Sequence, residues 1–181
     1  ENIKIDEIKE GQKYTGKRIS LVSYLDKAKI KIQIDIGFGD SVYPSPQLED
    51  YPVLLDLPAP HLLMYPKETV IAEKLEAVVS NGIFNSRIKD FFDLWMISKL
   101  FVLEDDKVVD AIRATFLRRE TAFPDRIPVG FSDEFFNNKD KQKQWNAFIK
   151  KNDIDISAES FSKVIHDIKN FYWPLMRGAS I

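Results

Sequence analysis

The sequence predicts an α+β fold in which a strand-rich region precedes a helical one. In the first third of the chain, β-branched residues alternate with polar residues at a period of two, which is typical of strands. After Pro66 the apolar residues recur at intervals of three and four, which is typical of helices. We therefore expect residues 1–65 to form the strand-rich part and residues 66–181 to form the helical region.

Strands are expected at residues 18–24, 29–36 and 51–57. In the second of these, isoleucines alternate with polar residues, so that one face of the strand is apolar and the other carries Asp35. The apolar face consists of Ile30, Ile32, Ile34 and Ile36. The Gly-Phe-Gly-Asp segment at 37–40 should end this strand.

Five helices are expected after Pro66, at about residues 67–80, 87–101, 106–119, 132–150 and 157–172. Gly82 suits the left-handed cap at the end of the first helix. Ser86 and Ser157 are the expected N-caps of the second and the last helix, and Pro174 lies near the end of the last one.

Composition limits the classes of function. The net charge is -2 and the sequence pI is about 5.8, so there is no overall basic field to attract nucleic acid. The chain has no cysteine, which excludes disulfides, thiolate zinc sites and cysteine nucleophiles and fits a reducing cytoplasm. No apolar run is long enough for a membrane helix, and the first residues do not resemble a signal peptide. We expect a cytoplasmic protein.

Asp35 is the first candidate site residue. It lies at the end of a strand between two isoleucines, where its carboxylate would be held rigidly at the edge of the sheet. A fixed oxygen ligand of this kind suits Mg²⁺. A solvent-facing aspartate before a turn is the alternative interpretation.

Lys74 is the second candidate. A helical projection of residues 67–80 puts it between Val70 and Val78, inside the apolar arc of the helix. A lysine there must either extend its ammonium to water or meet a negative partner. That partner could be a substrate phosphate, and a buried ion pair is the alternative.

A third candidate group begins the second helix. Asp90 and Asp93 are three residues apart and therefore lie on one face of that helix, with Arg87 and Lys89 close by. Two carboxylates and two cations could hold a metal-bound triphosphate or position an attacking hydroxyl. Acidic residues in a first helical turn can also simply complement the helix dipole.

Other charged residues give weaker signals. His61 and His166 have no neighbours at metal-ligand spacing, so surface or hydrogen-bonded histidines are expected. A lysine-rich helix near the C-terminus reads as a solvated face, yet it is also the best local patch for an RNA backbone because aromatic residues interrupt it. Its members are Lys139, Lys141, Lys143, Lys150 and Lys151, with Trp145 and Phe148.

The order of three segments resembles the AbiEii/AbiGii toxin family. These segments are Ile-Asp-Ile-Gly-Phe-Gly-Asp at 34–40, Tyr-Pro-Lys-Glu-Thr-Val-Ile-Ala-Glu-Lys-Leu-Glu-Ala at 65–77, and Arg-Ile-Lys-Asp-Phe-Phe-Asp-Leu at 87–94. Similar proteins are the toxins of bacterial type IV toxin–antitoxin and abortive-infection systems, which act in phage defence. The resemblance implies part of a nucleotidyltransferase-like mixed sheet followed by helices. It also implies Mg²⁺-dependent transfer of a nucleotide from an NTP to an acceptor, in some members tRNA, and an antitoxin that acts without forming a stable complex.

The resemblance implies a role for each candidate residue. Asp35 matches a carboxylate of the third strand that binds the metal or helps the attacking hydroxyl. Lys74, in the Ala-Glu-Lys-Leu motif, would contact the triphosphate. Asp90, in the Arg-x-Lys-Asp motif, would be the catalytic acid residue on the helix. Asp93 would support it, as would Arg87 and Lys89, which also bind the nucleotide.

One family motif is missing. Family members carry a Gly-Ser turn followed by Asp-x-Asp, which binds the metals, whereas the residues before Asp35 contain neither. The segment is therefore expected to lack two metal ligands and not to catalyse transfer by itself. Two other functions stay open: a non-enzymatic module that binds an antitoxin or RNA, and a phosphotransferase that acts on a small substrate.

Overall fold

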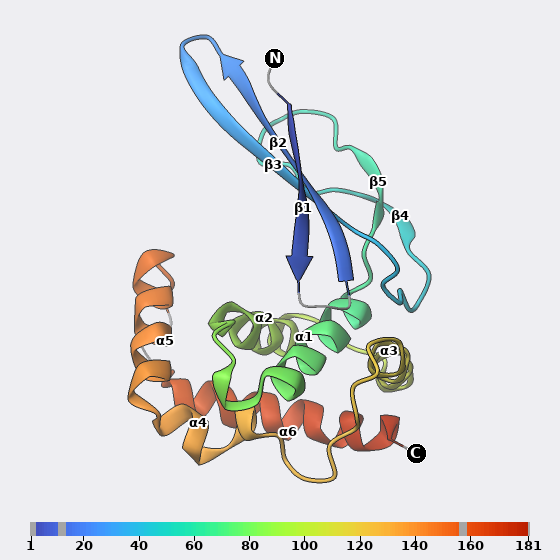
Figure 1. The fold of residues 1–181 in the computed structure, drawn as a ribbon, viewed down its shortest axis with the longest axis vertical. Helices are drawn as coiled ribbons and strands as arrows, with labels where there is room; N and C mark the ends of the chain where they lie inside the picture. The colour runs from blue at the N-terminus through green and yellow to red at the C-terminus, as the bar shows by residue number, and fades with distance from the viewer. Residues whose placement is uncertain (1–2, 11–13, 156–158, 181) are drawn as a thin grey trace. The chain divides into compact units, whose positions relative to one another are not determined.

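The computed structural model describes residues 3–10, 14–155 and 159–180. The fold is α+β with the helices in the C-terminal part, which confirms the predicted class (Figure 1). The chain forms two compact units, Glu1–Asp40 and Ser41–Ile181. The second unit therefore begins before the change from strands to helices at Pro66. Among the described residues, no helix combines the length and the apolar character that crossing a membrane requires.

The first unit is a three-stranded antiparallel sheet in the order β1-β2-β3. Its strands are β1 (Lys4–Glu10), β2 (Tyr14–Leu25) and β3 (Ala28–Gly37). The predicted strands at 18–24 and 29–36 lie inside β2 and β3, whereas β1 was not predicted. Pairing of Ile19 with Ile34 puts apolar residues of the two strands opposite each other. The four predicted isoleucines of β3 are 38–47% exposed, so they are not part of the core.

The second unit opens with a small antiparallel hairpin of β4 (Gln47–Asp50) and β5 (His61–Met64). The prediction of a strand at 51–57 is wrong, because this segment forms the loop between the two strands. Tyr51 N donates to Pro60 O (2.9 Å) and closes that loop. Leu54 and Leu55 are exposed, since the loop has neither a partner strand nor a buried face.

Six helices and two short 3₁₀ turns follow in the part of the chain that the structure describes (Figure 1). They are α1 (Lys67–Asn81), η1 (Gly82–Phe84), α2 (Ile88–Leu100), α3 (Asp105–Arg118), η2 (Val129–Phe131), α4 (Asp133–Asn137), α5 (Lys139–Lys151) and α6 (Phe161–Ala179). The buried apolar core lies between Ile71 and Ala179 and is made by the helices and η2. Helix α1 packs on α3, and α2 packs on α6.

Polar contacts also join α2 to α6. The Asp167 carboxylate of α6 accepts hydrogen bonds from Trp95 Nε1 (3.1 Å) and Lys163 Nζ (2.9 Å), and Lys99 Nζ lies 3.0 Å from it. Burial acts to raise the pKa of Asp167, but these donors lower it by more, so that it is about 2. The Tyr172 hydroxyl adds a buried hydrogen bond to Leu94 O (2.9 Å).

Two helix boundaries differ from the prediction for the C-terminal part. The helix expected at 132–150 is two helices, because the Asn138 side chain accepts hydrogen bonds from the backbone N–H groups of Asp140 and Lys141 and so caps a new helix. The last helix continues through Pro174 to Ala179. Its final turn buries Met176 and Ala179, which offsets the hydrogen bond that proline cannot make. The predicted cap Ser157 lies outside the described residues, and Ser160 caps the helix that begins at Phe161.

The junction between α1 and α2 also corrects the prediction. Ser86 does not cap α2: Arg87 holds the N-cap position, without a side-chain hydrogen bond. The Asn85 side chain takes this part, because its Oδ1 accepts from Arg87 N (2.9 Å). Gly82 has a positive φ of 51°, as predicted, but its ψ of -132° lies outside the left-handed helical region.

Candidate functional site

Lys74 and two aspartates of α2 form a partly buried ion cluster. Lys74 Nζ, on α1, donates to Asp90 Oδ1 (2.7 Å) and to Asp93 Oδ2 (2.8 Å). The three side chains are 15%, 7% and 21% exposed, so most of the surrounding solvent is excluded. The structure therefore brings together the Ala-Glu-Lys-Leu and Arg-x-Lys-Asp motifs.

Two more cations stand at the edge of this group. Lys89 Nζ donates to Asp93 Oδ2 (2.5 Å). Arg87 Nε lies 2.7 Å from Asp90 Oδ2, although that buried oxygen accepts no hydrogen bond. Arg87 and Lys89 are themselves 59% and 69% exposed. We call these five residues the Lys74 cluster: Lys74, Arg87, Lys89, Asp90 and Asp93.

Helical phase explains why these residues meet. Lys74 lies one turn from Val78 on the face of α1 that packs against other helices. Asp90 and Asp93 are three residues apart in α2 and share the face turned toward Lys74. Asp90 as a whole residue is only 5% exposed, so this face of α2 is buried as well. Helix α2 is covered on both faces where α1 crosses it.

The electrostatics of the cluster keep Lys74 charged. Burial lowers the pKa of Lys74, but hydrogen bonds and charge attraction from Asp90 and Asp93 raise it above 10.5 overall. Burial raises the pKa of Asp93, whereas the hydrogen bonds from Lys74 and Lys89 bring it below 3.8. Near neutral pH the cluster thus contains an ammonium ion beside an ionised carboxylate, in surroundings with little water.

Asp35 belongs to the other unit and has a different environment. Arg18 Nε and Nη2 donate to its two carboxylate oxygens at 2.7 and 2.8 Å, and Gln33 adds a third hydrogen bond at 3.2 Å. The hydrogen bond from Arg18 is the largest cause that lowers the pKa of Asp35. Both oxygens therefore already have a cation beside them. The pairing follows from the register that puts Arg18 opposite Asp35.

A metal ion needs several donor side chains that lie close together and are not already paired. Among the described residues, no three acidic, histidine or cysteine side chains form a group that could hold a metal. The Asp35 carboxylate is already paired with Arg18, and the carboxylates of Asp90 and Asp93 are already paired with Lys74. The described residues in this arrangement do not fit a Mg²⁺ ion.

The two histidines have ordinary partners. His61 Nδ1 lies 2.9 Å from Asp50 Oδ1, where β5 pairs with β4. His166 Nδ1 lies 2.7 Å from Ser162 O within α6. These contacts agree with the expected hydrogen-bonded histidines.

The lysine-rich helix α5 is a solvated face only in part. Lys141 is 7% exposed and Trp145 is 4% exposed, so neither is available to an RNA. Lys139, Lys143 and Lys150 are exposed. The aromatic side chain of Trp145 is therefore not part of an RNA-binding patch on this helix, because the helix turns that side toward the core.

Sequence reasoning missed three buried polar residues. Asn85 is 1% exposed, and Lys141 Nζ donates to its backbone carbonyl at 2.6 Å. Glu76 is 6% exposed and accepts from Arg119 Nη1 (2.8 Å) and Thr121 Oγ1 (2.6 Å). Lys141 shares its helical face with Trp145, and this spacing could have revealed its burial.

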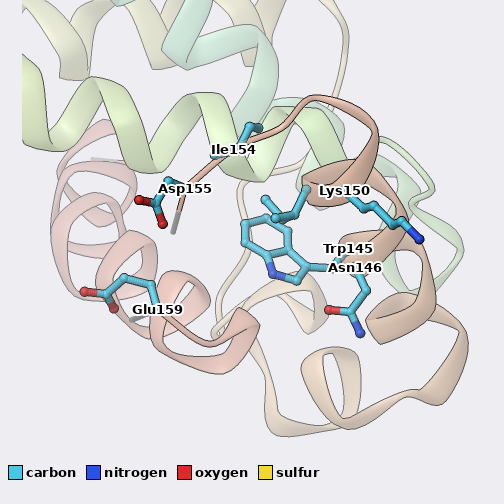
Figure 2. A pocket seen from close by; sticks show the side chains of 7 residues that line it. Trp145, Asn146, Lys150, Ile154, Asp155 and Glu159 are labelled. Atoms are coloured by element: carbon cyan, nitrogen blue, oxygen red, sulfur yellow. The ribbon is translucent and has the colours of Figure 1, made fainter. Parts of the chain in front are cut away.

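An open pocket lies between α5 and the start of α6 (Figure 2). Trp145, Asn146 and Lys150 stand on one side, and Asp155 and Glu159 on the other. The Trp145 ring stacks on Phe161 at 4.9 Å, which makes it part of the core. Neither Asp35 nor any residue of the Lys74 cluster lines this pocket.

Comparison with known proteins identifies the family. The family model described as nucleotidyl transferase AbiEii toxin, type IV TA system, matches residues 1–167. The chain belongs to this family. Searches of the curated proteins and of the solved structures found no match. The match spans both motifs of the Lys74 cluster. The activity of the family is nucleotidyl transfer, and its setting is a type IV toxin–antitoxin system.

Proposed function

We propose that the Lys74 cluster binds the triphosphate of an NTP and takes part in the transfer of a nucleotide to an acceptor, with tRNA as the first acceptor to test. One observation carries this proposal: residues of two separate motifs meet at Lys74 Nζ, 2.7 Å from Asp90 and 2.8 Å from Asp93. The match to the AbiEii family supports the reaction class.

The cluster offers cations suited to a polyphosphate. An ammonium group has three N–H donors, and two of those of Lys74 go to carboxylates. Its third N–H can donate to a phosphate oxygen. Arg87 and Lys89 are exposed, so their charged ends can turn to the same phosphates at little desolvation cost. Together they would neutralise the charge that develops on the leaving pyrophosphate.

The carboxylates suit the other half of the reaction. In nucleotidyl transfer, an acceptor hydroxyl oxygen forms a bond to the α-phosphorus, and the bond from that phosphorus to the bridging oxygen of pyrophosphate breaks. Asp90 or Asp93 can accept the hydroxyl proton as the new bond forms. Asp93 is the more accessible of the two, at 21% exposed against 7%, and we assign it the contact with the hydroxyl. Asp90 then holds Lys74 in place.

Mg²⁺ stays a prediction from the family resemblance. Asp35 could bind the ion only if its pair with Arg18 opened, because that pair uses both carboxylate oxygens. We therefore derive no step through the metal. The antitoxin partner and a role in abortive infection of phage-infected cells are likewise proposals, supported by the type IV toxin–antitoxin family. We expect the antitoxin to act without a stable complex with this chain.

The test is a transfer assay on the full-length protein that the gene encodes. Each labelled NTP would be incubated with total tRNA in the presence and in the absence of Mg²⁺. The variants are Lys74→Met, Asp90→Asn, Asp93→Asn and the double variant Arg87→Met/Lys89→Met. The matched control is Lys143→Met, because Lys143 is 78% exposed on α5 and lies outside the cluster.

We expect label transfer by the wild type and the Lys143→Met control, and its loss in Lys74→Met, Asp90→Asn and Asp93→Asn. The double variant should raise KM for the NTP, because it removes two cations from the rim. Circular dichroism of each variant would show that the fold persists. Transfer at the wild-type rate by folded Lys74→Met and Asp90→Asn would overturn the proposal. Absence of transfer with every NTP would favour a binding module instead.

A further inference from the structure

We propose that Lys141 is a positioning residue of the Lys74 cluster: its Nζ–H···O bond to Asn85 fixes the turn that sets Arg87 and Asp90 opposite Lys74. The inference rests on the proposed function and adds to it a residue on a helix far along the chain. No motif of the two segments 65–77 and 87–94 contains Lys141 or Asn85.

The burial of Lys141 is unusual for its type. The side chain of a lysine is rarely buried without a carboxylate partner, because desolvation of the ammonium is costly. Lys141 is 7% exposed, and its Nζ has one hydrogen bond, to the carbonyl of Asn85 at 2.6 Å. The same Nζ lies 5.3 Å from the centre of the Phe135 ring, a cation–π distance. Burial lowers the pKa of Lys141.

Asn85 is the point through which Lys141 acts. Each of its polar groups has a partner. Its N–H donates to Gly82 O (3.2 Å), its Nδ2 to Ala77 O (3.1 Å), and its Oδ1 accepts from Arg87 N (2.9 Å). The carbonyl takes the bond from Lys141. One residue thus joins the end of α1, the start of α2 and the start of α5.

This turn decides where the α2 half of the cluster lies. Arg87 is the N-cap residue of α2, and Asp90 N donates to Arg87 O (2.9 Å) one turn later. Any rotation of the Asn85 turn would therefore move both residues relative to Lys74 on α1. The contact between Lys74 and Asp90 spans only 2.7 Å, so small displacements break it. A misplacement of about 1 Å at a catalytic group can reduce the rate about 100-fold.

A purely structural role predicts a different outcome from a positioning role. Loss of a buried cation that has no carboxylate partner removes a desolvation cost, whereas a buried carbonyl left without a donor is destabilising. Methionine keeps most of the length of the Lys141 side chain and can still pack against Phe135, but it removes both the charge and the donor. These two effects oppose each other, so Lys141→Met should change the free energy of unfolding little, while the Asn85 carbonyl loses its partner.

The experiment uses the full-length protein, the Lys141→Met variant and the exposed control Lys143→Met on the same helix. Hydrogen exchange of peptides that cover residues 82–93 reports on the turn without any need for activity. Transfer kinetics and urea unfolding are measured on the same samples. We expect Lys141→Met to exchange at least tenfold faster in this segment and to lose at least tenfold in kcat, with KM for the NTP changed less than threefold. The control should match the wild type.

Three results would overturn the inference. The first is unchanged exchange at 82–93 in Lys141→Met, which means that the lysine does not hold the turn. The second is faster exchange with an unchanged kcat, which limits Lys141 to local structure. The third is a loss of activity that merely follows a loss of folded protein in the urea data. If the wild type transfers no nucleotide, the proposed function fails, and the exchange data alone still decide whether Lys141 fixes the turn.

Discussion

Removing the charge of Lys74 should destabilise the protein strongly, and the size of the effect follows from the geometry. Lys74→Met keeps the aliphatic stem but leaves Asp90 and Asp93 without the ammonium that lies 2.7 and 2.8 Å away. Breaking a buried ion pair by removing one partner costs about 3–5 kcal/mol. Arg87 and Lys89 remain beside the two carboxylates, so we expect the lower end of this range, about 3 kcal/mol.

The effect should depend on pH with a definite sign. The pKa of Asp93 is lowered in the folded wild type by Lys74 and Lys89, against the opposing effect of burial. A lowered carboxylate pKa contributes stability above the unfolded pKa, and this contribution is lost as the pH falls through the folded pKa. The difference between wild type and Lys74→Met should therefore be largest above pH 5 and should shrink as the pH falls below 3.8.

Urea unfolding followed by tryptophan fluorescence measures this difference, because Trp95 lies in α2 and is 8% exposed. The combined variant Lys74→Met/Asp90→Asn/Asp93→Asn provides the check. Removing all three charges should restore much of the stability, since no uncompensated carboxylate remains. A loss below 1 kcal/mol for Lys74→Met, independent of pH, would refute the reasoning and would mean that the cluster is well solvated.

Two further predictions concern the helical core. Asp167→Asn should lower the free energy of unfolding by about 1–2 kcal/mol at pH 7 after allowance for screening, because the wild-type pKa of about 2 lies below 3.8. Thermal unfolding between pH 2 and pH 7 should show that this loss of stability vanishes as the pH falls from 3.8 toward 2. Gly130→Ala should cost about 1–3 kcal/mol in urea unfolding, because its Cβ would lie 2.7 Å from Val78 Cγ1. The control Gly178→Ala, whose Cβ would lie 3.5 Å from the nearest atom, should be neutral or stabilising by about 0.5–1 kcal/mol; equal losses in both variants would contradict the packing argument.

The reach of sequence reasoning is clearest where an element is long and periodic. The ranges expected for α1, α2 and α3 differ from the observed bounds by at most one residue at either end, because an amphipathic helix needs only its own residues to set its phase. The strand expected at 51–57 does not form, because a strand also needs a partner strand with which to pair. Pro52 and Pro58 cannot donate to one, and the hairpin formed on either side of them.

The buried lysines Lys74 and Lys141 show what the sequence predicts about a polar side chain and what only the tertiary structure adds. Helical phase alone put Lys74 on a buried face, where its ammonium must either extend to water or meet a negative partner. The same argument from helical phase applies to Lys141, which shares a face with Trp145. The run of neighbouring lysines, however, is typical of a solvated face. The packing of α5 against the Asn85 turn encloses this lysine.

The sequence by itself determined the α+β order, the first three helices, the family resemblance and the residues from which the Lys74 cluster is drawn. The tertiary structure decided which of them meet. Lys74 pairs with Asp90 and Asp93 because α1 crosses α2 at that turn, and Asp35 pairs with Arg18 because the register of β2 and β3 sets them opposite each other. The physical reason is that phase and period are properties of neighbouring residues, whereas the partner of a side chain depends on how whole elements pack.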